Sequence, residues 1–443
     1  MIDLFETQRD MRHRREAAVR RGIVAVLDIG SSKIACLVLQ FVTEPSAESP
    51  TDVTIPTMGS FRVVGVATTR SRGVQFGEIV DMNETERAVR TVVQGAQKMA
   101  NTRVNHVIVS FAGGRPRSYG LDGTVDVEHG EVTERDIGNV LASCEVPPFG
   151  HDRKALHALP VNFTLDHKSG LSDPRGQIGA KLSVDMHMLT VSGTPVENLL
   201  ECLQRCDLEV AGLSFSGFAS GVSALMEDEQ KLGAAVVDFG GGSTSIAVFI
   251  RNHMIYGDAV RMGGDHITSD ICQGLHVSMD VAERIKTLHG GLHATSADDR
   301  DLIEVPNPMA QWDNDRRTVT RSELIGVMRP RVEEILEEVR ARLDASGFEH
   351  LPSQRIVLTG GSSQIPGLED MASRILGRHT RIGKPLRVQG LPQAAAGPAF
   401  SAAVGMALHA SQPQDECWDF EVPSDRLGTR RIRQAMRWFR ENW

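Results

Sequence analysis

The chain has 443 residues, which is more than one ordinary hydrophobic core holds and therefore predicts two to four domains. Hydrophobic residues make up 41% and charged residues 24%, as in globular proteins, and the net charge of −9 argues against a body that binds nucleic acid. The six cysteines include no CxxC pair and no zinc-type cluster, which favours a reduced, cytosolic compartment.

Neither a secretory signal nor a membrane-spanning segment is predicted. The N-terminus begins with charged residues and lacks the apolar region of a signal peptide. No apolar stretch approaches the roughly 20 residues that cross a bilayer. If the protein meets a membrane, we expect it to lie on the membrane surface.

Residues 1–21 form a basic extension that carries six arginines. The part from Arg9 to Arg21 is basic and predicted to be helical, and it has few apolar residues. A solvated extension is the favoured interpretation. A weak contact with lipid or with a partner is the alternative.

An internal repeat is the clearest feature of the chain. Ile23–Gly30 (IVAVLDIG) is a predicted buried strand, and Lys33–Phe41 (KIACLVLQF) is its return strand. About two hundred residues later, Ala234–Gly240 (AAVVDFG) and Ser243–Ile250 (STSIAVFI) repeat the arrangement. Each copy is an apolar strand that ends in Asp-x-Gly, a tight turn, and a second apolar strand.

The two turns contain the residue types of a phosphate-binding clamp. Glycines let the backbone approach an anion closely, and N–H and hydroxyl groups then cradle phosphates. Asp28 and Asp238 stand at strand ends where they can hold Mg²⁺ through water, and Lys33 can reach terminal phosphates. One such hairpin is a common tight turn. Two copies are far more specific, because facing hairpins form a clamp around a nucleoside triphosphate.

Two further segments favour the same site. The strand Arg355–Leu358 leads into Gly360 and Gly361 and then a helical stretch, which is a geometry that binds nucleotides. The predicted helix Asp280–His289 places Glu283 and Lys286 on one face, where they can flank an adenosine. A solvated surface ion pair is the alternative for these two residues. The chain has no P-loop sequence, and its Asp-Phe-Gly triplet lacks the other protein-kinase motifs.

The last part of the chain changes character. Ser411–Asp425 is polar, acidic and interrupted by prolines, so it is predicted to be a linker. Arg426–Trp443 is predicted to form an amphipathic helix. Its apolar face gathers Ile432, Ala435, Met436, Phe439 and Trp443, its opposite face gathers Arg430, Arg433, Arg437 and Arg440, and Trp438 lies on the boundary.

This pattern is typical of an interfacial helix that inserts an apolar strip into a membrane and sets arginines on anionic headgroups. A terminal helix docked on the body is one alternative, and a target helix of the calmodulin type is another. The preceding linker and the exposed tryptophans favour the membrane.

The motifs, taken in order, resemble the superfamily of actin, sugar kinases and chaperone ATPases, and within it the FtsA family of actin-like cell-division proteins. Gly212–Gly242 is similar to the segment that joins the two halves in this family, and Met262–Gly290 resembles its adenosine-binding segment. Glu131–Ser192 resembles the small subdomain inserted in FtsA proteins and in related pilus proteins, at a place where actin has no equivalent.

The resemblance implies an α/β, actin-like fold of two lobes with duplicated RNase H-like cores, an inserted α+β subdomain and a C-terminal amphipathic helix. The implied units are residues 1–21 as an extension; 22–103, 184–230 and 391–410 as the first lobe; 104–183 as the inserted subdomain; 231–262 and 319–390 as the core of the second lobe; 263–318 as its small subdomain; 411–425 as a linker; and 426–443 as the membrane-targeting helix.

The resemblance also implies that ATP and Mg²⁺ bind in a cleft between the lobes, with Asp28 and Asp238 holding the metal through water. The implied nucleotide-binding residues are Gly30, Ser31, Ser32 and Lys33 on one side, Gly240, Gly241, Gly242 and Ser243 on the other, and Gly263, Gly264, Glu283, Lys286, Gly360 and Gly361 around the rest of the nucleotide.

Rapid hydrolysis is not expected. An attacking water is usually oriented by Gln, Asp or His, and in the superfamily that group often comes from the segment that joins the halves. Leu213–Ala224 offers only serines there, namely Ser214, Ser216, Ser220 and Ser223. Water positioned by Asp28 or Asp238 through Mg²⁺ is the alternative. No catalytic residue is assigned, and we expect tight nucleotide binding with slow or undetectable turnover.

The implied function is cell division at the cytoplasmic face of the bacterial inner membrane. A family member polymerises, binds the C-terminal tail of the tubulin-like protein FtsZ, tethers FtsZ filaments to the anionic membrane and helps to recruit later division proteins. A pilus-assembly adaptor or another actin-like membrane ATPase is the alternative. A sugar kinase has no use for the terminal helix, and a heat-shock chaperone needs a further domain for which no residues remain.

Overall fold

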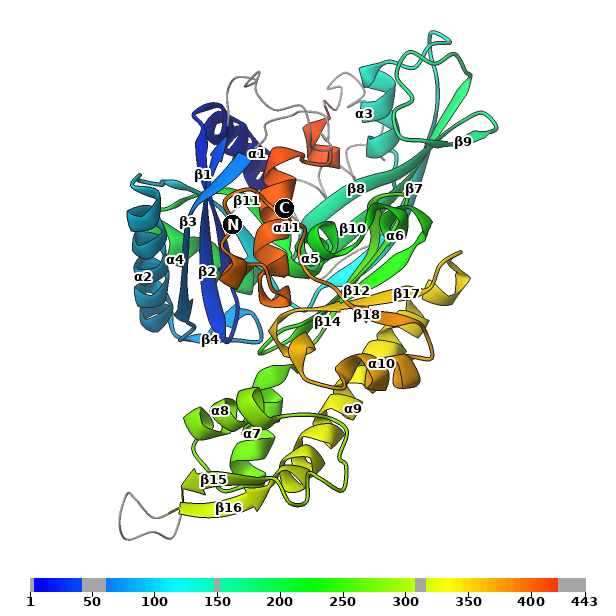
Figure 1. The fold of residues 1–443 in the computed structure, drawn as a ribbon. Coiled ribbons are helices and arrows are strands. Elements are labelled where there is room, and N and C mark those ends of the chain that lie inside the picture. Colours follow the sequence, from blue (N-terminus) through cyan, green and yellow to red (C-terminus); the bar gives the residue numbers. More distant parts are fainter. Residues whose placement is uncertain (1–3, 42–60, 147–151, 307–315, 421–443) are drawn as a thin grey trace, which may run out of the picture.

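Two five-stranded sheets with the same strand order form the centre of the molecule. The computed structural model describes residues 4–41, 61–146, 152–306 and 316–420, and Figure 1 shows how its elements are arranged. In each sheet an antiparallel hairpin contains the central strand, which pairs in parallel with the next strand along the sheet.

The first sheet has the order β11-β6-β1-β2-β3. Ala25 and Leu27 of its central strand belong to the apolar cluster that contains α2, whereas Val24 and Val26 belong to the cluster that contains α11. Because helices cover both faces, the strands are nearly continuous apolar runs. The elements of this layer are β1 (Ile23–Ile29), β2 (Lys33–Phe41), β3 (Phe61–Arg70), β6 (His106–Phe111), β11 (Glu209–Phe215), α2 (Met82–Ala100), α4 (Gly193–Arg205) and α11 (Ser401–Ser411), with a short hairpin of β4 (Val74–Gln75) and β5 (Glu78–Ile79).

The second sheet repeats this order when it is listed from the matching edge, as β18-β17-β12-β13-β14. Helices α9 and α10 cover one face, and α5 packs on the other face and against α11, between the two sheets. The bounds are β12 (Ala234–Phe239), β13 (Thr244–Ile250), β14 (His253–Val260), β17 (Arg355–Thr359), β18 (Thr380–Ile382), α5 (Ser216–Ala224), α6 (Glu227–Leu232), α9 (Arg321–Ala345) and α10 (Leu368–Leu376). The predicted duplicated α/β fold is confirmed, and we call the layers around the two sheets the first and the second lobe.

Two smaller units extend from the lobes. The second lobe carries α7 (Gly264–Gly274), α8 (Met279–His289), β15 (Leu302–Pro306) and β16 (Arg316–Thr320), at the lower end of Figure 1. The first lobe carries an inserted subdomain, a sheet of order β7-β10-β8-β9 that packs with α3. Its elements are β7 (Arg117–Asp126), α3 (Glu134–Ala142), β8 (Arg153–Leu165), β9 (Lys168–Leu171) and β10 (Lys181–Ser192).

The N-terminal helix α1 (Leu4–Arg20) packs on β11 and β1 of the first lobe, so the prediction of a solvated extension is wrong. Its inner face repeats every three or four residues and is fully buried, although half of it is polar: Gln8, Met11, Arg15 and Ala18. The Gln8 amide donates to the carbonyl of Leu156 at 3.0 Å. A hydrophobicity pattern cannot reveal a face whose polar groups find their partners only in the folded protein.

Residues 412–420, which we call the strap, are docked on the body, so the linker prediction fails for this part of the chain. Trp418 is only 3% exposed and, with Cys417 and Phe420, joins the apolar cluster of the inserted subdomain. The buried Glu416 carboxylate accepts hydrogen bonds from the Ala158 N–H at 2.8 Å and from the His157 ring at 3.1 Å. The acidic composition pointed to a linker, but the acids are the groups that hold the strap in place.

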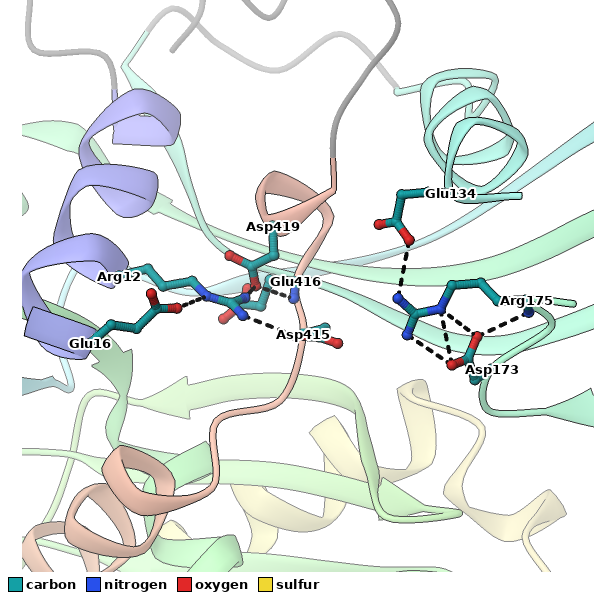
Figure 2. A network of polar contacts seen from close by, with 8 residues as sticks. All are labelled: Arg12, Glu16, Glu134, Asp173, Arg175, Asp415, Glu416 and Asp419. Carbon is teal, nitrogen blue, oxygen red and sulfur yellow. Dashed lines mark hydrogen bonds and ion pairs between the residues drawn. The ribbon is translucent and has the colours of Figure 1, made fainter. Parts of the chain in front are cut away.

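Helix α1 and the strap are joined by charged groups. Figure 2 shows the Arg12 guanidinium between Glu16 of its own helix, at 3.0 Å, and Asp415 and Asp419 of the strap. The Arg9 side chain donates to the Trp418 carbonyl at 2.9 Å. Burial raises the pKa of Asp419 to about 6, partly offset by the charge of Arg12. The first described helix thus holds a segment that follows some 400 residues later.

A buried histidine in the inserted subdomain makes stability depend on pH. Burial, assisted by His157, lowers the pKa of His187 from 6.5 to about 3. Below pH 6.5 the unfolded chain therefore binds a proton that the native protein does not, and the free energy of unfolding falls as the pH drops toward 3. Between pH 6.5 and 5 we expect this one group to cost about 2 kcal/mol.

The measurement compares thermal unfolding at pH 7.5, 6 and 5 for the parent protein, His187→Gln and His167→Gln. The first variant is expected to lose less stability on acidification than the parent. His167 is exposed in the same subdomain, so its variant is expected to follow the parent. Equal acid losses in the parent and in His187→Gln would contradict the assignment.

Candidate functional site

Two hairpins face each other across a cleft between the lobes. The turn after β1 is closed by a hydrogen bond from the Gly30 N–H to the Lys33 carbonyl at 3.1 Å, and the turn after β12 is closed by the same bond between Gly240 and Ser243, also at 3.1 Å. The turns nearly touch, because a Cβ on Gly242 would lie 2.3 Å from the Ser31 hydroxyl. Both turns line a cavity of about 550 Å³, a size typical of small-molecule sites.

The structure brings nearly all the predicted nucleotide-binding residues to this cavity. Its wall includes Gly30, Ser31, Ser32, Lys33, Gly240, Gly241, Gly242, Ser243, Gly264, Glu283, Lys286, Gly360 and Gly361, together with Asp28 and Asp238. Gly263 does not line it, because the start of α7 packs behind the second hairpin, with the Gly264 N–H bonded to the Gly240 carbonyl at 2.9 Å. Wall residues that sequence reasoning missed include Asp265, Thr287, Ser362, Gln364 and Ala399.

Three charged side chains form the centre of the cleft. Burial raises the pKa of Asp28, and it raises the pKa of Asp238 to about 6. Burial also lowers the pKa of Lys33, although both carboxyl groups act in the opposite direction. The Lys33 ammonium donates to the Ala399 carbonyl at 2.7 Å and lies 3.6 Å above the Phe400 ring. Two acidic groups share one lysine, so the cleft has a deficit of positive charge.

A serine from a neighbouring element holds each of the two carboxylates, and sequence reasoning did not assign these serines to the metal site. Ser110 lies opposite Asp28 in the parallel pair of β6 and β1 and donates to its carboxylate. Ser220 on α5 donates to Asp238 at 2.5 Å. In the sequence Ser220 stands out only as one of the serines that the connecting segment offers where a Gln, Asp or His would orient water. The available signal for Ser110 was that it is itself a polar residue near the end of an apolar strand.

The donor chemistry of this centre fits Mg²⁺. Carboxylate oxygens are hard ligands, and a nearby cation favours the ionised form of buried acids such as Asp28 and Asp238. Within the described part of the chain, no cluster of three or more His, Cys, Asp or Glu side chains is arranged to hold a metal. The remaining ligands of such an ion would therefore be waters and phosphate oxygens, as is usual for Mg²⁺.

Lys286 is a buried anchor rather than one half of a solvated ion pair. Its side chain is 10% exposed, and its ammonium contacts Glu283 at 2.6 Å, the Thr268 hydroxyl at 2.7 Å and the Gly264 carbonyl at 3.1 Å. Glu283 is 46% exposed and faces the cavity. The pair joins α8 to the start of α7, so that both helices present a fixed wall to the cleft.

The serines of the connecting segment already have partners in the protein. Ser216 and Ser245 share a hydrogen bond at 2.9 Å, and Ser223 donates to the Ser401 carbonyl at 2.7 Å. Ser214 lies 3.4 Å from the His157 ring, and Ser220 is bonded to Asp238. Of the four, only Ser216 lines the cavity. This arrangement agrees with the expectation of slow hydrolysis, which stays a prediction.

Side chains from both lobes meet beside the hairpins. Arg70 of β3 pairs with Asp280 of α8 at 2.6 Å, and Glu78 of β5 pairs with Arg261 at 2.9 Å. A second cavity, of about 800 Å³, shares Ser31, Ser32 and Glu283 with the first. The Arg70–Asp280 pair is exposed and lies beside the second cavity, so it contributes little to stability, whereas the Glu78–Arg261 pair is partly buried.

The predicted membrane-binding residues cannot be compared with the structure. Ile432, Met436, Trp438, Phe439, Trp443 and the four arginines of the predicted terminal helix lie outside the described residues. Among the helices that are described, none is both long and apolar enough to cross a bilayer.

The sequence matches two family profiles. The profile described as "Cell division protein FtsA" matches residues 235–405, and the profile described as "SHS2 domain inserted in FTSA" matches residues 113–190, which contain the inserted subdomain up to Thr190. Proteins of similar fold include the PilM–PilN type IV pilus biogenesis complex, with a TM-score of 0.61 at 16% identity over 88% of this chain and 99% of the other. MreB 5 of Spiroplasma citri bound to AMPPNP aligns with a TM-score of 0.50 at 13% identity over 87% and 95%.

Curated relatives align over most of their length. The cell division protein FtsA of Rhizobium meliloti is 42% identical over 391 residues, which cover 88% of this chain and 87% of the relative. The FtsA proteins of Pseudomonas aeruginosa and Escherichia coli K12 are 31% and 30% identical, and they cover 96% and 88% of this chain and 100% and 91% of their own lengths. With the actin-like fold and the inserted subdomain, these similarities show that the chain belongs to the FtsA family of cell division proteins.

Proposed function

We propose that this cell-division protein binds ATP with Mg²⁺ in the cleft, assembles into filaments, and tethers FtsZ filaments to the cytoplasmic face of the inner membrane. The observation that carries the nucleotide part is the convergence of two matching Asp-x-Gly hairpins on one cavity. The solved MreB 5 structure of similar fold contains AMPPNP, which supports the choice of ligand.

In this proposal the two turns receive the phosphates through their N–H and hydroxyl groups, and Lys33 contacts the terminal phosphates. Glu283 and Lys286 border the adenosine, and Gly360 and Gly361 contact the region of the α-phosphate. Bound Mg²⁺ would supply the positive charge that the cleft lacks, held through water by Asp28 and Asp238. The nucleotide then acts mainly as a switch that closes the cleft and favours self-association.

The predicted helix 426–443 supplies the membrane anchor. Liposome co-sedimentation with anionic lipid and ATP tests this, using the intact chain and a chain that ends at Asp425. We expect only the intact chain to pellet, and avidity in filaments is expected to strengthen its binding. If both proteins stay in solution, the helix is not an anchor, and the tethering function fails with it.

The FtsZ tail is proposed to bind the unit of residues 263–318, away from the cleft. The inserted subdomain is proposed to contact the next subunit or later division proteins. A fluorescent FtsZ tail peptide that binds the intact protein and is displaced by unlabelled tail tests the first contact. An undetectable affinity at 100 μM protein would argue against it.

Turnover is predicted to be slow, because the connecting segment offers no Gln, Asp or His and its serines are engaged elsewhere. We expect steady-state phosphate release well below 1 s⁻¹, the lower end of the usual enzyme range. The assay uses the intact protein with vesicles and Mg-ATP, so that the proposed filaments can assemble on lipid during the measurement. A rate of about 1 s⁻¹ or more would overturn this prediction.

A further inference from the structure

Helix α1 has an exposed basic face opposite the face that packs on the first lobe. Asp10, His13, Arg14 and Arg20 of the helix and Arg21 directly after it are exposed, so this surface carries three arginines and one acid. Arg9 is exposed as well, but its side chain is bound to the Trp418 carbonyl. No described residue forms an ion pair with Arg14, Arg20 or Arg21. The remainder of the chain is acidic enough to give a net charge of −9, which makes a basic surface of this kind unusual for the protein.

The strap fixes where the C-terminal part of the chain leaves the body. It runs beside α1, to which Arg9 and Arg12 bind it, and its last described residue, Phe420, is buried in the inserted subdomain. Five residues, 421–425, separate this point from the predicted amphipathic helix. An extended chain of that length reaches roughly 20 Å. A helix lying in the headgroup layer would therefore hold the α1 side of the body close to the lipid surface.

From these two observations we infer that the exposed face of α1 is a second membrane-binding surface, which takes anionic lipid headgroups through Arg14, Arg20 and Arg21. This inference rests on the proposed membrane anchor, and it further specifies which side of the body faces the membrane. Anionic headgroups are the occupant that the charge of the face and the short reach of 421–425 both select. The unit that contains α8 and β16 lies at the end of the molecule opposite α1 (Figure 1), so in this orientation it would face away from the lipid.

The buried side of α1 holds the exposed basic face in a fixed position on the first lobe. Arg12 and Arg15 on the inner side are held by the strap and by burial, so they contribute to the position of the helix and not to the exposed charge. Lipid contact through a packed helix differs from that of a mobile basic tail, since the backbone of the helix is already ordered and only the arginine side chains lose freedom when they bind.

The test measures the binding of the full chain to vesicles of phosphatidylcholine with and without phosphatidylglycerol. The charge-reversed set Arg14→Glu, Arg20→Glu and Arg21→Glu is expected to weaken binding to anionic vesicles about 100-fold and to reduce its salt dependence. The milder set Arg14→Gln, Arg20→Gln and Arg21→Gln is expected to have a smaller effect. Binding to neutral vesicles is expected to be unchanged in both sets.

The matched control reverses three exposed arginines at the far end, Arg284→Glu, Arg300→Glu and Arg316→Glu, which change the net charge by the same amount. It is expected to bind anionic vesicles within about threefold of the parent. An equal loss in this control would assign the effect to overall charge and overturn the inference.

If both sets of Arg14, Arg20 and Arg21 variants bind anionic vesicles as the parent does, the inference is overturned and the proposed anchor is unaffected. The same holds if these variants change self-association but not the binding to vesicles. Whether the anchor itself fails is measured separately, by comparing the co-sedimentation of the intact chain with that of the chain that ends at Asp425. Such a failure would overturn both.

Discussion

Replacing Gly360 by alanine is expected to lower the affinity for ATP at least tenfold and to destabilise the second lobe by roughly 2–5 kcal/mol. Gly360 has φ +88° and ψ 168°, a conformation essentially confined to glycine. A Cβ there would lie 2.3 Å from a carboxylate oxygen of Asp238 and 2.6 Å from the Phe239 carbonyl. The methyl group must therefore displace the acid that is proposed to hold the metal waters.

Gly377→Ala is the matched control. Gly377 also has a positive φ of +63°, but it ends α10, and a Cβ there would meet no atom within 4 Å. This variant is expected to lose about 1 kcal/mol of stability and none of its affinity. Titration with a fluorescent ATP analogue and thermal unfolding measure both quantities. A Gly360→Ala protein that binds the analogue within twofold of the parent would contradict the proposed site.

Replacing Glu416 by alanine is expected to release the strap and to destabilise its junction with α1 by about 2–5 kcal/mol. The buried carboxylate accepts from the His157 ring and from the Ala158 N–H, and the second nitrogen of His157 accepts from the Phe215 N–H at 2.9 Å. Removal leaves two buried donors without a partner. Hydrogen–deuterium exchange is expected to show faster exchange in α1 and in residues 412–420, with the second lobe unchanged.

Asp415→Ala removes a carboxylate from the same strap and serves as the control. Asp415 is 54% exposed and lies 3.3 Å from the Arg12 guanidinium. We expect it to contribute about 0.5 kcal/mol or less, as exposed ion pairs usually do. Equal exchange in the two variants would show that charge along the strap matters more than the buried hydrogen bonds of Glu416.

The hairpins and the cleft were predictable because the features that specify them are local. Each Asp-x-Gly turn lies between two apolar strands in one short stretch, and its repetition after some two hundred residues makes the duplication visible in the sequence itself. The predicted carboxylates Asp28 and Asp238 accordingly line one cavity in the structure. The serines that hold them come from other elements, so nothing near either aspartate in the sequence marks Ser110 or Ser220.

The predictions for residues 1–21 and 412–420 are wrong for a common physical reason. Arg12, Asp415 and Asp419 read as solvated charges in separate segments, because composition measures each segment alone. In the fold they neutralise one another across the junction of α1 and the strap. Trp418 is a large apolar residue in this acidic segment, but the site that buries it is built from strands of the inserted subdomain, which are distant in the sequence.

The contact between α1 and the strap also constrains how the protein folds during synthesis. The strands of the second lobe lie in one continuous stretch, residues 234–382, so that lobe has all its sheet before the chain is finished. The first lobe must wait, because α11 and the partners of Arg12 are among the last residues to be made. We expect the second lobe to fold first, reversing the usual N-terminal-first order. A chain that ends at Asp425 keeps the strap and can complete both lobes, whereas one that ends before residue 412 leaves Arg9 and Arg12 of α1 without their partners in the strap.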